Sequence, residues 1–477
     1  MSSTRIGPKD LRTLLGEWEN DGQSAYHALA DRIRLLIIDG RIPTRTRLPA
    51  ERELADELER SRTTIVSAYR ALRETGHVVS QRGSGSVVAL PQAHGRPGGL
   101  PDAGPAVVDL ARAAPAAISG LETIVQRATD RLPEVLGKTG FDLIGSLPLR
   151  ERIAGHYTER GLPTHPGQLM ITLGAQHAIA LIGRTLVRRA DRVLVESPTY
   201  PHALDGLRMS GGRLVTVPVT AGGWDGDRLR DAFERVRPSL AYLIPDFQNP
   251  TGASMPPAQR DDVVRDARRA GTVLVVDETT ADLDIDRGWT DVPFAARAES
   301  CRTVTIGSLG KSVWGGLRIG WIRADDDVIG ALHGARAAGD LGTPELEQLV
   351  AAEVFEDYPA LVQRRAEQLR HHRDTLVREL RERLPHWDVP VPDGGVSLWV
   401  GLGAPISSTL ALFALTRGLS LIAGPRFGVD GAFERFLRIP YTSHVDELTR
   451  GVHLLEDTAR SLPALPAGRA PHLAEVV

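Results

Sequence analysis

The sequence predicts a multidomain protein that joins an α-rich winged helix-turn-helix to an α/β domain and a smaller α+β C-terminal region. Helical patterns followed by a hairpin pattern occupy residues 25–90, and a Pro- and Gly-rich stretch occupies 91–106. From about residue 107, apolar strand-like runs alternate with helices, which indicates a mostly parallel sheet. A chain of 477 residues also exceeds the size that one hydrophobic core usually serves.

The overall composition is that of an ordinary globular protein, with 42% apolar residues, 25% charged residues and a net charge of −3. One cysteine, Cys301, cannot form an internal disulfide or a cysteine-based metal cluster, and we expect no metal site. The N-terminus lacks the apolar core of a signal peptide, and no apolar run approaches the roughly 20 residues that span a bilayer. We therefore expect a cytoplasmic protein with no membrane partner.

Changes in pattern set the expected domain boundaries. Residues 1–24 are expected to form an N-terminal arm and residues 91–106 a linker. A long helical run beginning near residue 341 separates a large α/β domain from a smaller one. The expected segments are therefore an arm (1–24), a winged helix-turn-helix (25–90), a linker (91–106), a large domain (107–340), a small domain (341–460) and a tail (461–477).

The winged helix-turn-helix is predicted from three helices and a hairpin. SAYHALADRIRLLIIDG and PAERELADELE have helical spacing, and SRTTIVSAYRALRETG begins at the N-cap Ser61 and stops at Gly76. HVVSQ and SVVAL flank RGSG, which predicts the hairpin. The third helix would place its first residues at base edges and phosphates of double-stranded DNA. An arginine-rich domain with a solvated face explains the same pattern about equally well.

The segment from Arg47 to Ala89 resembles the winged-helix domain of GntR-type transcriptional regulators. It contains LP-x-ER-x-LA, the SRTT-x-x-x-AY-x-x-L block and the GSG wing in the same order. The resemblance implies that Arg52, Arg62, Thr63 and Thr64 contact operator DNA and that the wing glycines approach its backbone. The DNA-binding candidates are Arg52, Ser61, Arg62, Thr63, Thr64, Arg82 and Gly83.

The polar residues of the α/β domain follow the ends of its apolar runs. QLMITLG, DRVLVES, LAYLIPD, TVLVVD and TVTI are each followed by small, polar or charged residues. Open α/β sheets bind ligands at the carboxyl ends of their strands, so these residues are expected to share one edge. The candidates are Gly174, Ala175, Gln176, Ser197, Pro198, Tyr200, Asn249, Asp277, Ser308, Lys311 and Arg318.

Lys311 lies in TIGSLGKSVWGGLRIGWI and is one of three lysines among 57 Lys and Arg residues. A lysine, phosphate donors, an aromatic ring (Tyr200) and a carboxylate (Asp277) suit pyridoxal 5′-phosphate. The lysine would form the imine, and the carboxylate would pair with the protonated ring nitrogen. Arginine cannot replace the lysine, because its guanidinium stays protonated. Each residue alone has an ordinary explanation, such as a helix cap or a β-turn, but their order favours a cofactor site.

Residues from about 107 to 460 resemble a fold-type I pyridoxal-phosphate-dependent aminotransferase. The matching blocks are LRERIAGHY, ITLGAQHAI, ESPTYP, PDFQNPTG, VVDE, SLGKSVWGGLRIGW and FLRI. With the GntR-type head, this is the architecture of the MocR subfamily of regulators, and the resemblance implies a homodimer. It further implies that Lys311 carries the imine, that Asp277 meets the ring nitrogen and that Asn249 lies near the ring hydroxyl of the cofactor. By the same resemblance, Tyr200 stacks on the ring, and Ser308 and Arg318 hold the phosphate. Arg438 would take the carboxylate of an amino-compound effector.

The sequence departs from this family at three places. Thr279 and Thr280 stand where the family usually has a tyrosine that reaches the cofactor hydroxyl. Gly140, with Phe141 beside it, stands where a tyrosine usually reaches the partner subunit's phosphate, and Ala175 replaces a common Ser or Thr. The lost hydroxyls argue against efficient transamination.

Three functions fit these observations. The first is a transcription regulator that binds pyridoxal phosphate and senses the cofactor or an amino compound. The second is a working aminotransferase with an accessory DNA-binding head, in which Lys311 shuttles protons. The third is a scaffold that binds DNA and no cofactor. The pattern favours the first, because an intact lysine site is combined with a DNA-binding unit and weakened catalytic surroundings.

Overall fold

The computed structural model describes residues 6–16, 18, 24–38, 42, 46–81, 85–89, 108–220, 222–298, 301–429 and 432–462. The expected linker, nearly all of the expected tail, and the candidates Arg82 and Gly83 lie outside the described residues. Contacts group the chain into two units, which are described separately. The first contains Met1–Asp109, Ile406–Arg426 and His453–Val477, and the second contains Leu110–Pro405 and Phe427–Val452.

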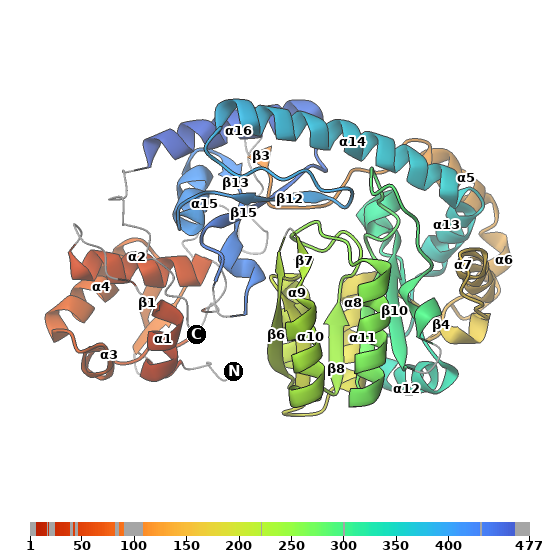
Figure 1. Ribbon diagram of the computed structural model, residues 1–477, viewed down its shortest axis with the longest axis horizontal. Helices are drawn as coiled ribbons and strands as arrows, with labels where there is room; N and C mark the ends of the chain where they lie inside the picture. Colours follow the sequence, from red (N-terminus) through yellow and green to blue (C-terminus); the bar gives the residue numbers. More distant parts are fainter. Residues whose placement is uncertain are drawn as a thin grey trace. The chain divides into compact units, whose positions relative to one another are not determined.

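The N-terminal part of the first unit is the expected winged helix-turn-helix (Figure 1). Its helices pack around a core that contains Leu29, Ile33, Ile65 and Tyr69. The Tyr69 hydroxyl donates a 3.0 Å hydrogen bond to the carbonyl of Pro49, which ties α4 to the start of α3. The elements are α2 (Ala25–Ile38), α3 (Glu51–Leu58), α4 (Arg62–Glu74), β1 (Val78–Gln81) and β2 (Gly85–Val88), the last two paired antiparallel.

The segment expected to be an N-terminal arm contains a helix, α1 (Pro8–Leu15). Leu11 and Leu15 are fully buried in the same core as the winged helix-turn-helix. The backbone N–H of Ile6 also donates to the carbonyl of Arg47 at 3.1 Å. The expectation of an arm is wrong for these residues. Their helix was missed because eight residues provide too short a periodic pattern.

The remaining elements of the first unit come from late in the chain. They include α15 (Ser407–Thr416), β13 (Leu419–Ser420) and β14 (Ile422–Ala423), which we expected within the small domain. Strand β13 pairs in parallel with β3 (Val108–Asp109). Helix α16 (Val445–Ser461) begins in the second unit and continues into the first.

The second unit is built on a sheet with the strand order β4-β11-β10-β9-β8-β5-β6-β7. Neighbours from β10 to β6 are parallel, whereas β11 runs antiparallel to both β10 and β4. The predicted apolar runs all form strands of this sheet. The strands are β4 (Leu169–Thr172), β5 (Arg192–Ser197), β6 (Arg213–Thr220), β7 (Gly223–Trp224), β8 (Leu240–Leu243), β9 (Val273–Asp277), β10 (Thr303–Ser308) and β11 (Gly320–Arg323).

Helices cover both faces of this sheet, which explains why its central strands are apolar throughout. On one face, α8, α9 and α12 contribute Ile179, Leu204 and Val328 to a core with β5 and β10. On the other face, α10 and α11 contribute Leu229 and Val263, and Figure 1 shows these two helices side by side. The bounds are α8 (Ala175–Leu186), α9 (Pro201–Met209), α10 (Gly226–Asp231), α11 (Pro257–Ala270) and α12 (Asp326–Arg336).

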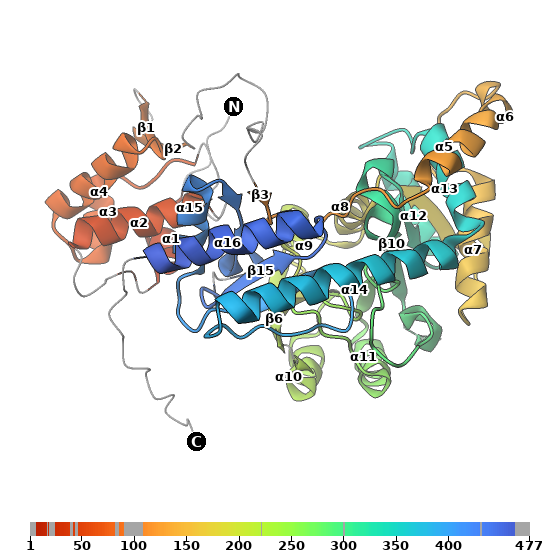
Figure 2. The ribbon, with the colours of Figure 1, turned by 90° about the horizontal axis from the view of Figure 1, so that it is seen from above.

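The long helical run predicted from residue 341 is divided in the structure. It forms α13 (Glu345–Phe355) and α14 (Tyr358–Arg383), with Pro359 in the first turn of the second helix. Proline is tolerated there because the first N–H groups of a helix have no partner within it. Figure 2 shows α14 as one long helix. Other elements are α5 (Leu121–Asp130), α6 (Pro133–Leu136), α7 (Leu147–Glu159), and the antiparallel pair β12 (Ser397–Gly401) and β15 (Phe436–Pro440).

No described helix combines the length and the apolar character needed to cross a bilayer.

Replacing Leu11 with alanine should destabilise the winged helix-turn-helix by about 2–5 kcal/mol, because a fully buried side chain leaves a cavity. Urea unfolding of the full chain, followed together with DNA binding, measures this effect. The matched control is Lys9→Ala on the exposed side of the same helix, which should change little. Equal stability of the two variants would contradict the placement of α1 in the core.

Candidate functional site

The predicted site residues lie at one edge of the sheet. Strands β4, β5, β8, β9 and β10 run in the same direction, so the segments that follow them meet at that edge. Strand β11 runs the opposite way, and the residue that precedes it therefore reaches the same edge. This explains how Arg318, at the far end of the connection from β10 to β11, joins the others.

Lys311 lies on a π-helical turn, η4 (Gly310–Trp314), directly after β10. Its Nζ donates a 2.5 Å hydrogen bond to the carbonyl of Ala113. Burial, together with the positive charges of Arg438 and Arg318, lowers the pKa of Lys311 to about 8, against the opposing effect of Asp277. A larger fraction of the amine is therefore unprotonated, and thus nucleophilic, than for an ordinary lysine.

Asp277 ends β9 and is held by two donors. The Tyr242 hydroxyl donates to Oδ2 at 2.6 Å, and the backbone N–H of Thr279 donates to Oδ1 at 2.9 Å. Burial, and then the charge of Asp277, raises the pKa of Tyr242, so its hydroxyl remains a donor. Tyr242 comes from the middle of an apolar strand, and sequence reasoning missed it because nothing in LAYL distinguishes a site tyrosine from a core tyrosine.

Gly174, Arg318 and the start of α8 form a cradle for an anion. Arg318 Nη2 donates to the carbonyl of Leu173 at 2.7 Å, and a Cβ at Gly174 would lie 3.2 Å from this nitrogen. A Cβ at Gly320 would lie 2.7 Å from the carbonyl carbon of Gly174, so glycine at both positions permits the close approach. The guanidinium and the first N–H groups of α8, at Ala175 and Gln176, together favour a phosphate.

Ser308 lies beside this cradle at the end of β10. Its hydroxyl donates to the carbonyl of Ile319 at 3.1 Å and accepts from the N–H of Gly310 at 3.0 Å. These bonds fix the turn that carries Lys311 against the residues that precede β11.

Several polar atoms near this edge are buried without a hydrogen-bond partner among the described residues. They are Oδ1 of Asn249, Oγ1 of Thr279 and Oε1 of Gln176. Leaving such atoms unsatisfied costs free energy, and a polar ligand would relieve that cost. With Lys311, Asp277 and the anion cradle, this set fits pyridoxal phosphate.

The loops that carry Tyr200 and Asn249 are tied together through Glu196, which sequence reasoning also missed. Gln248 Nε2 donates to Glu196 at 3.0 Å and to the carbonyl of Pro198 at 2.7 Å, which ties together the loops after β8 and β5. Burial raises the pKa of Glu196 to about 7, although four hydrogen-bond donors favour its charged form. The half-buried Tyr200 ring lies near Tyr242, and its hydroxyl contacts His202 Nδ1 at 3.2 Å.

Arg438 on β15 is buried, and its guanidinium lies 5.2 Å from the centroid of the Phe427 ring. It donates to the carbonyl of Ala111. Its charge lowers the pKa of Lys311, which places the two cations in one site. A guanidinium here suits a carboxylate, because the two can pair through two hydrogen bonds.

The DNA-binding candidates lie on the exposed side of the winged helix-turn-helix. Arg62 and Thr63 are exposed on the first turn of α4, and Arg52 is exposed on α3. Ser61 is the N-cap, as predicted, because its hydroxyl accepts from the N–H of Thr64 at 3.1 Å. That bond gives Ser61 a structural role, whereas Arg62 and Thr63 present polar groups to solvent.

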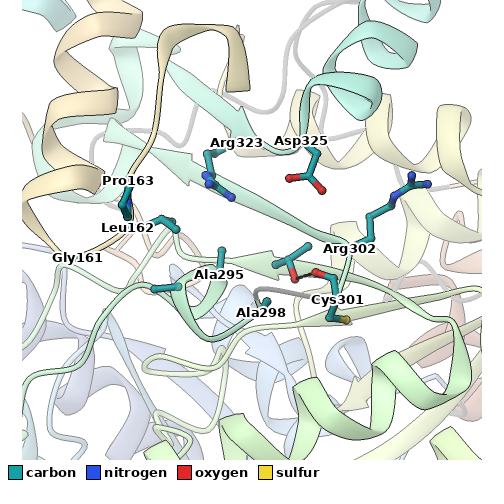
Figure 3. Close-up of a pocket in the computed structure, with 11 residues that line it drawn as sticks. Gly161, Leu162, Pro163, Ala295, Ala298, Cys301, Arg302, Arg323 and Asp325 are labelled. Atoms are coloured by element: carbon teal, nitrogen blue, oxygen red, sulfur yellow. Dashed lines mark hydrogen bonds between the residues drawn. The ribbon is translucent and has the colours of Figure 1, made fainter.

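A cavity of about 510 Å³ lies away from these residues, at the opposite ends of the strands (Figure 3). It is bordered by Arg302 and Thr303 at the start of β10, and by Arg323 at the end of β11. None of the residues predicted for the site lines it. This cavity is therefore separate from the predicted site.

Comparison with known proteins identifies both parts of the chain. Residues 117–454 match the family of class I and II aminotransferases. The chain belongs to this family. Residues 25–88 match the bacterial regulatory proteins of the gntR family, so a GntR-type DNA-binding domain precedes a fold-type I aminotransferase domain. This combination is that of MocR-type regulators.

The proteins that resemble this chain include both enzymes and transcription regulators. A 2-aminoadipate transaminase of Thermus thermophilus is 30% identical over 67% of this chain and 81% of its own. The transcriptional regulator YisV of Bacillus subtilis is 24% identical over 94% of this chain and 99% of its own. Among solved structures, this chain resembles LysN, an alpha-aminoadipate aminotransferase from T. thermophilus, in its complex with N-(5′-phosphopyridoxyl)-L-leucine. The two sequences are 27% identical, and the structural alignment covers 75% of this chain and 92% of LysN with a TM-score of 0.68.

The structure shows the surroundings of the residues that depart from the aminotransferase pattern. Thr280 donates to the carbonyl of Asp246 at 2.9 Å, whereas the Thr279 hydroxyl is one of the unpartnered buried groups. Gly140 has a φ of 76°, which strains a residue with a side chain, so a tyrosine there would need a different backbone. Phe141 beside it is 71% exposed.

Lys311 should couple to added pyridoxal phosphate with a rate that rises with pH around a midpoint near 8, because only the unprotonated amine attacks a carbonyl. Arg438→Gln removes a charge that lowers the pKa of Lys311, so its midpoint should move to higher pH. Stopped-flow absorbance measures both profiles. A wild-type midpoint near the usual lysine value of 10.5, or identical profiles for the two proteins, would refute this description.

Tyr242→Phe should weaken retention of pyridoxal phosphate by about 5- to 10-fold, which corresponds to the loss of one hydrogen bond to Asp277, the carboxylate predicted to pair with the ring nitrogen of the cofactor. Equilibrium dialysis with absorbance detection measures this change. Tyr157→Phe is the control, since Tyr157 is equally buried but its hydroxyl bonds Trp321 instead. Similar losses in both variants would assign the effect to general destabilisation.

Proposed function

We propose that this protein is a DNA-binding transcription regulator whose aminotransferase domain binds pyridoxal 5′-phosphate at Lys311 and senses the cofactor or an amino compound. The observation that carries the proposal is the Lys311 amine, whose pKa is lowered to about 8 between a carboxylate and two guanidinium groups. It is supported by the GntR-type domain and by the regulator relative that aligns along almost the whole chain.

The residues at the sheet edge would each hold one part of the cofactor. The N–H groups of Ala175 and Gln176, with Ser308 and Arg318, suit the phosphate, and Asp277 suits the ring nitrogen. Tyr200 would stack on the ring and Asn249 would meet its hydroxyl. When bound, pyridoxal phosphate supplies an aldehyde that reacts with amines and a ring that withdraws electrons. Tyr242 and Thr279 donate hydrogen bonds to the Asp277 carboxylate, and these bonds would keep it oriented toward that ring.

Arg438 would select the effector by its carboxylate. A guanidinium buried beside the Phe427 ring is poorly solvated, so an anion that pairs with it replaces few interactions with water. An amino compound with a carboxylate could therefore engage Arg438 while its amino group lies near the Lys311 site.

A working transaminase with an accessory DNA-binding domain is the second candidate. The transaminase relative and the lowered pKa of Lys311, which suits a proton-shuttling base, favour it. The lost tyrosine hydroxyls argue against efficient turnover. Steady release of a keto acid from an amino donor would favour the enzyme, whereas adducts that form without product would favour the regulator.

A homodimer is also proposed. The side chains of Phe141 and Leu341 are 71% and 54% exposed. An isolated β-bridge pairs Asp142 with Gly342, and it therefore brings the neighbouring Phe141 and Leu341 close together. Adjacent exposed apolar side chains are typical of an interface with another protein. The family resemblance favours a second copy of this chain at that surface.

Pyridoxal phosphate should change the affinity for operator DNA by at least about fivefold, the lower end of ordinary coupling between two sites. Fluorescence anisotropy with a labelled operator fragment, with and without cofactor, measures the change. Lys311→Ala should abolish the response, whereas Lys138→Ala, which removes an exposed lysine, should keep it. Identical affinity and footprint in all three proteins with and without cofactor would refute a regulatory role.

A further inference from the structure

The cavity at the opposite ends of the strands contains a buried arginine with few bonds. Arg323, the last residue of β11, is 7% exposed, and its side chain points into the cavity (Figure 3). Its Nε donates one long hydrogen bond, of 3.4 Å, to Thr164 Oγ1. Its two terminal nitrogens form no hydrogen bond or ion pair with any residue that the structure describes. Most donors of this guanidinium are therefore left for the cavity.

Other buried arginines of the same unit use their guanidinium groups fully. Arg260, Arg336 and Arg365 are 1%, 0% and 0% exposed, and each donates through all three nitrogens. Arg260 reaches the Asp246 carboxylate at 2.7 Å, and Arg336 reaches that of Asp340 at 2.9 Å. Burying a cation without such bonds costs free energy. Unused guanidinium donors that face a cavity therefore indicate a site for an acceptor.

The negative groups near Arg323 do not compensate its charge. Burial lowers the pKa of Arg323, and it outweighs the opposing effects of Tyr157, Asp325 and Glu278. Burial also raises the pKa of Glu278 to about 7, so this carboxyl group is only partly charged at neutral pH. An anion that enters the cavity would therefore meet a cation that is still short of a counter-charge.

Asp325 brings the opposite charge to the same cavity. It is the N-cap residue of α12, but its side chain makes no capping hydrogen bond. Its carboxylate is exposed and forms no ion pair with Arg323, although both side chains line the cavity. Arg302, the other cation that lines the cavity, is already paired with Asp327 at 2.6 Å. One guanidinium and one carboxylate thus lie close together without a direct bond.

Apolar side chains form another part of the cavity. In Figure 3, Ala295 and Ala298 lie across the cavity from Arg323 and Asp325. The apolar residues that line it are Leu162, Pro163, Ala295, Ala296 and Ala298. The volume of about 510 Å³ is within the usual range of about 300–1,000 Å³ for small-molecule sites. The cavity thus offers a cation, an anion and an apolar surface to one small molecule.

We propose that this cavity binds a small amino acid with an apolar side chain, whose carboxylate is held by Arg323 and whose ammonium group faces Asp325. A carboxylate and a guanidinium pair through two hydrogen bonds, and an α-amino acid carries its two charges on one carbon. Such a ligand bridges the two side chains that do not bond each other. The inference goes beyond the proposed function, because neither the cofactor nor Lys311 takes part in it.

Calorimetric titration of the full-length protein with L-leucine tests this site. The titrated parent is Arg438→Gln after treatment with pyridoxal phosphate and borohydride, so that neither an imine nor Arg438 can take the amino acid. We expect one leucine to bind per chain with a Kd below about 5 mM. Arg323→Met in the same background should weaken binding by at least about tenfold, because charge-assisted hydrogen bonds are lost. Absence of binding to the parent, or equal binding by both proteins, would contradict the inference.

Asp325→Asn tests the second charge without changing a buried group. This variant should bind L-leucine about two- to fivefold more weakly, as expected for an exposed ion pair. It should bind 4-methylpentanoate, which is leucine without its amino group, more tightly than the parent does, because Asp325 repels a lone carboxylate. Weaker binding of both ligands would refute the role given to Asp325. This exchange of preference decides the question even if Arg323→Met fails to fold.

Arg302→Met is the matched control. Its guanidinium also lines the cavity but is bonded to Asp327, so leucine affinity should stay within about twofold of the parent value. An equal loss in Arg302→Met and Arg323→Met would assign binding to general positive charge and overturn the inference. Failure here leaves the cofactor proposal intact, because the two sites share no residue. If pyridoxal phosphate instead fails to bind at Lys311, the proposed function fails and the leucine titration still gives its own result.

Discussion

The arrangement of the site depends on keeping a lysine amine buried beside two guanidinium groups. Burial disfavours the charged form of the amine, and the charges of Arg438 and Arg318 disfavour it further, so the pKa of Lys311 is lowered to about 8. Asp277 offsets part of the repulsion and is itself held by Tyr242 and Thr279. The same electrostatics that make Lys311 a nucleophile also create a strong demand for anions, which a phosphate and a carboxylate would satisfy.

The sheet makes this concentration of charge possible. Its parallel strands gather their carboxyl ends, and the reversed β11 adds a residue from the opposite chain direction. Helices on both faces bury the strands, so the predicted polar residues of this sheet gather at its strand ends and in the loops of one edge. Glu196 and Gln248 then join two of these loops below the surface, which fixes Tyr200 and Asn249 without using either side chain.

Local pattern was sufficient to predict much of this protein. The strands, the winged helix-turn-helix, the N-cap at Ser61 and the family followed from periodicity, turn residues and ordered motifs. The helix α1 was missed because it is short and gains its stability from burial of Leu11 against distant residues. Tyr242 and Glu196 were missed for a related reason. Their roles arise from contacts between segments far apart in the chain.

The close approach of Gly320 to Gly174 has a consequence for how this family can vary. A side chain at either position would enter space held by the other segment, where Arg318 also lies. A substitution there cannot be accommodated by moving one loop alone, because α8 and β11 are both fixed in the sheet and its covering helices. A side chain at Gly320 therefore requires the backbone at Gly174 to move as well. Related sequences that have lost one of them should have rebuilt the turn around the other.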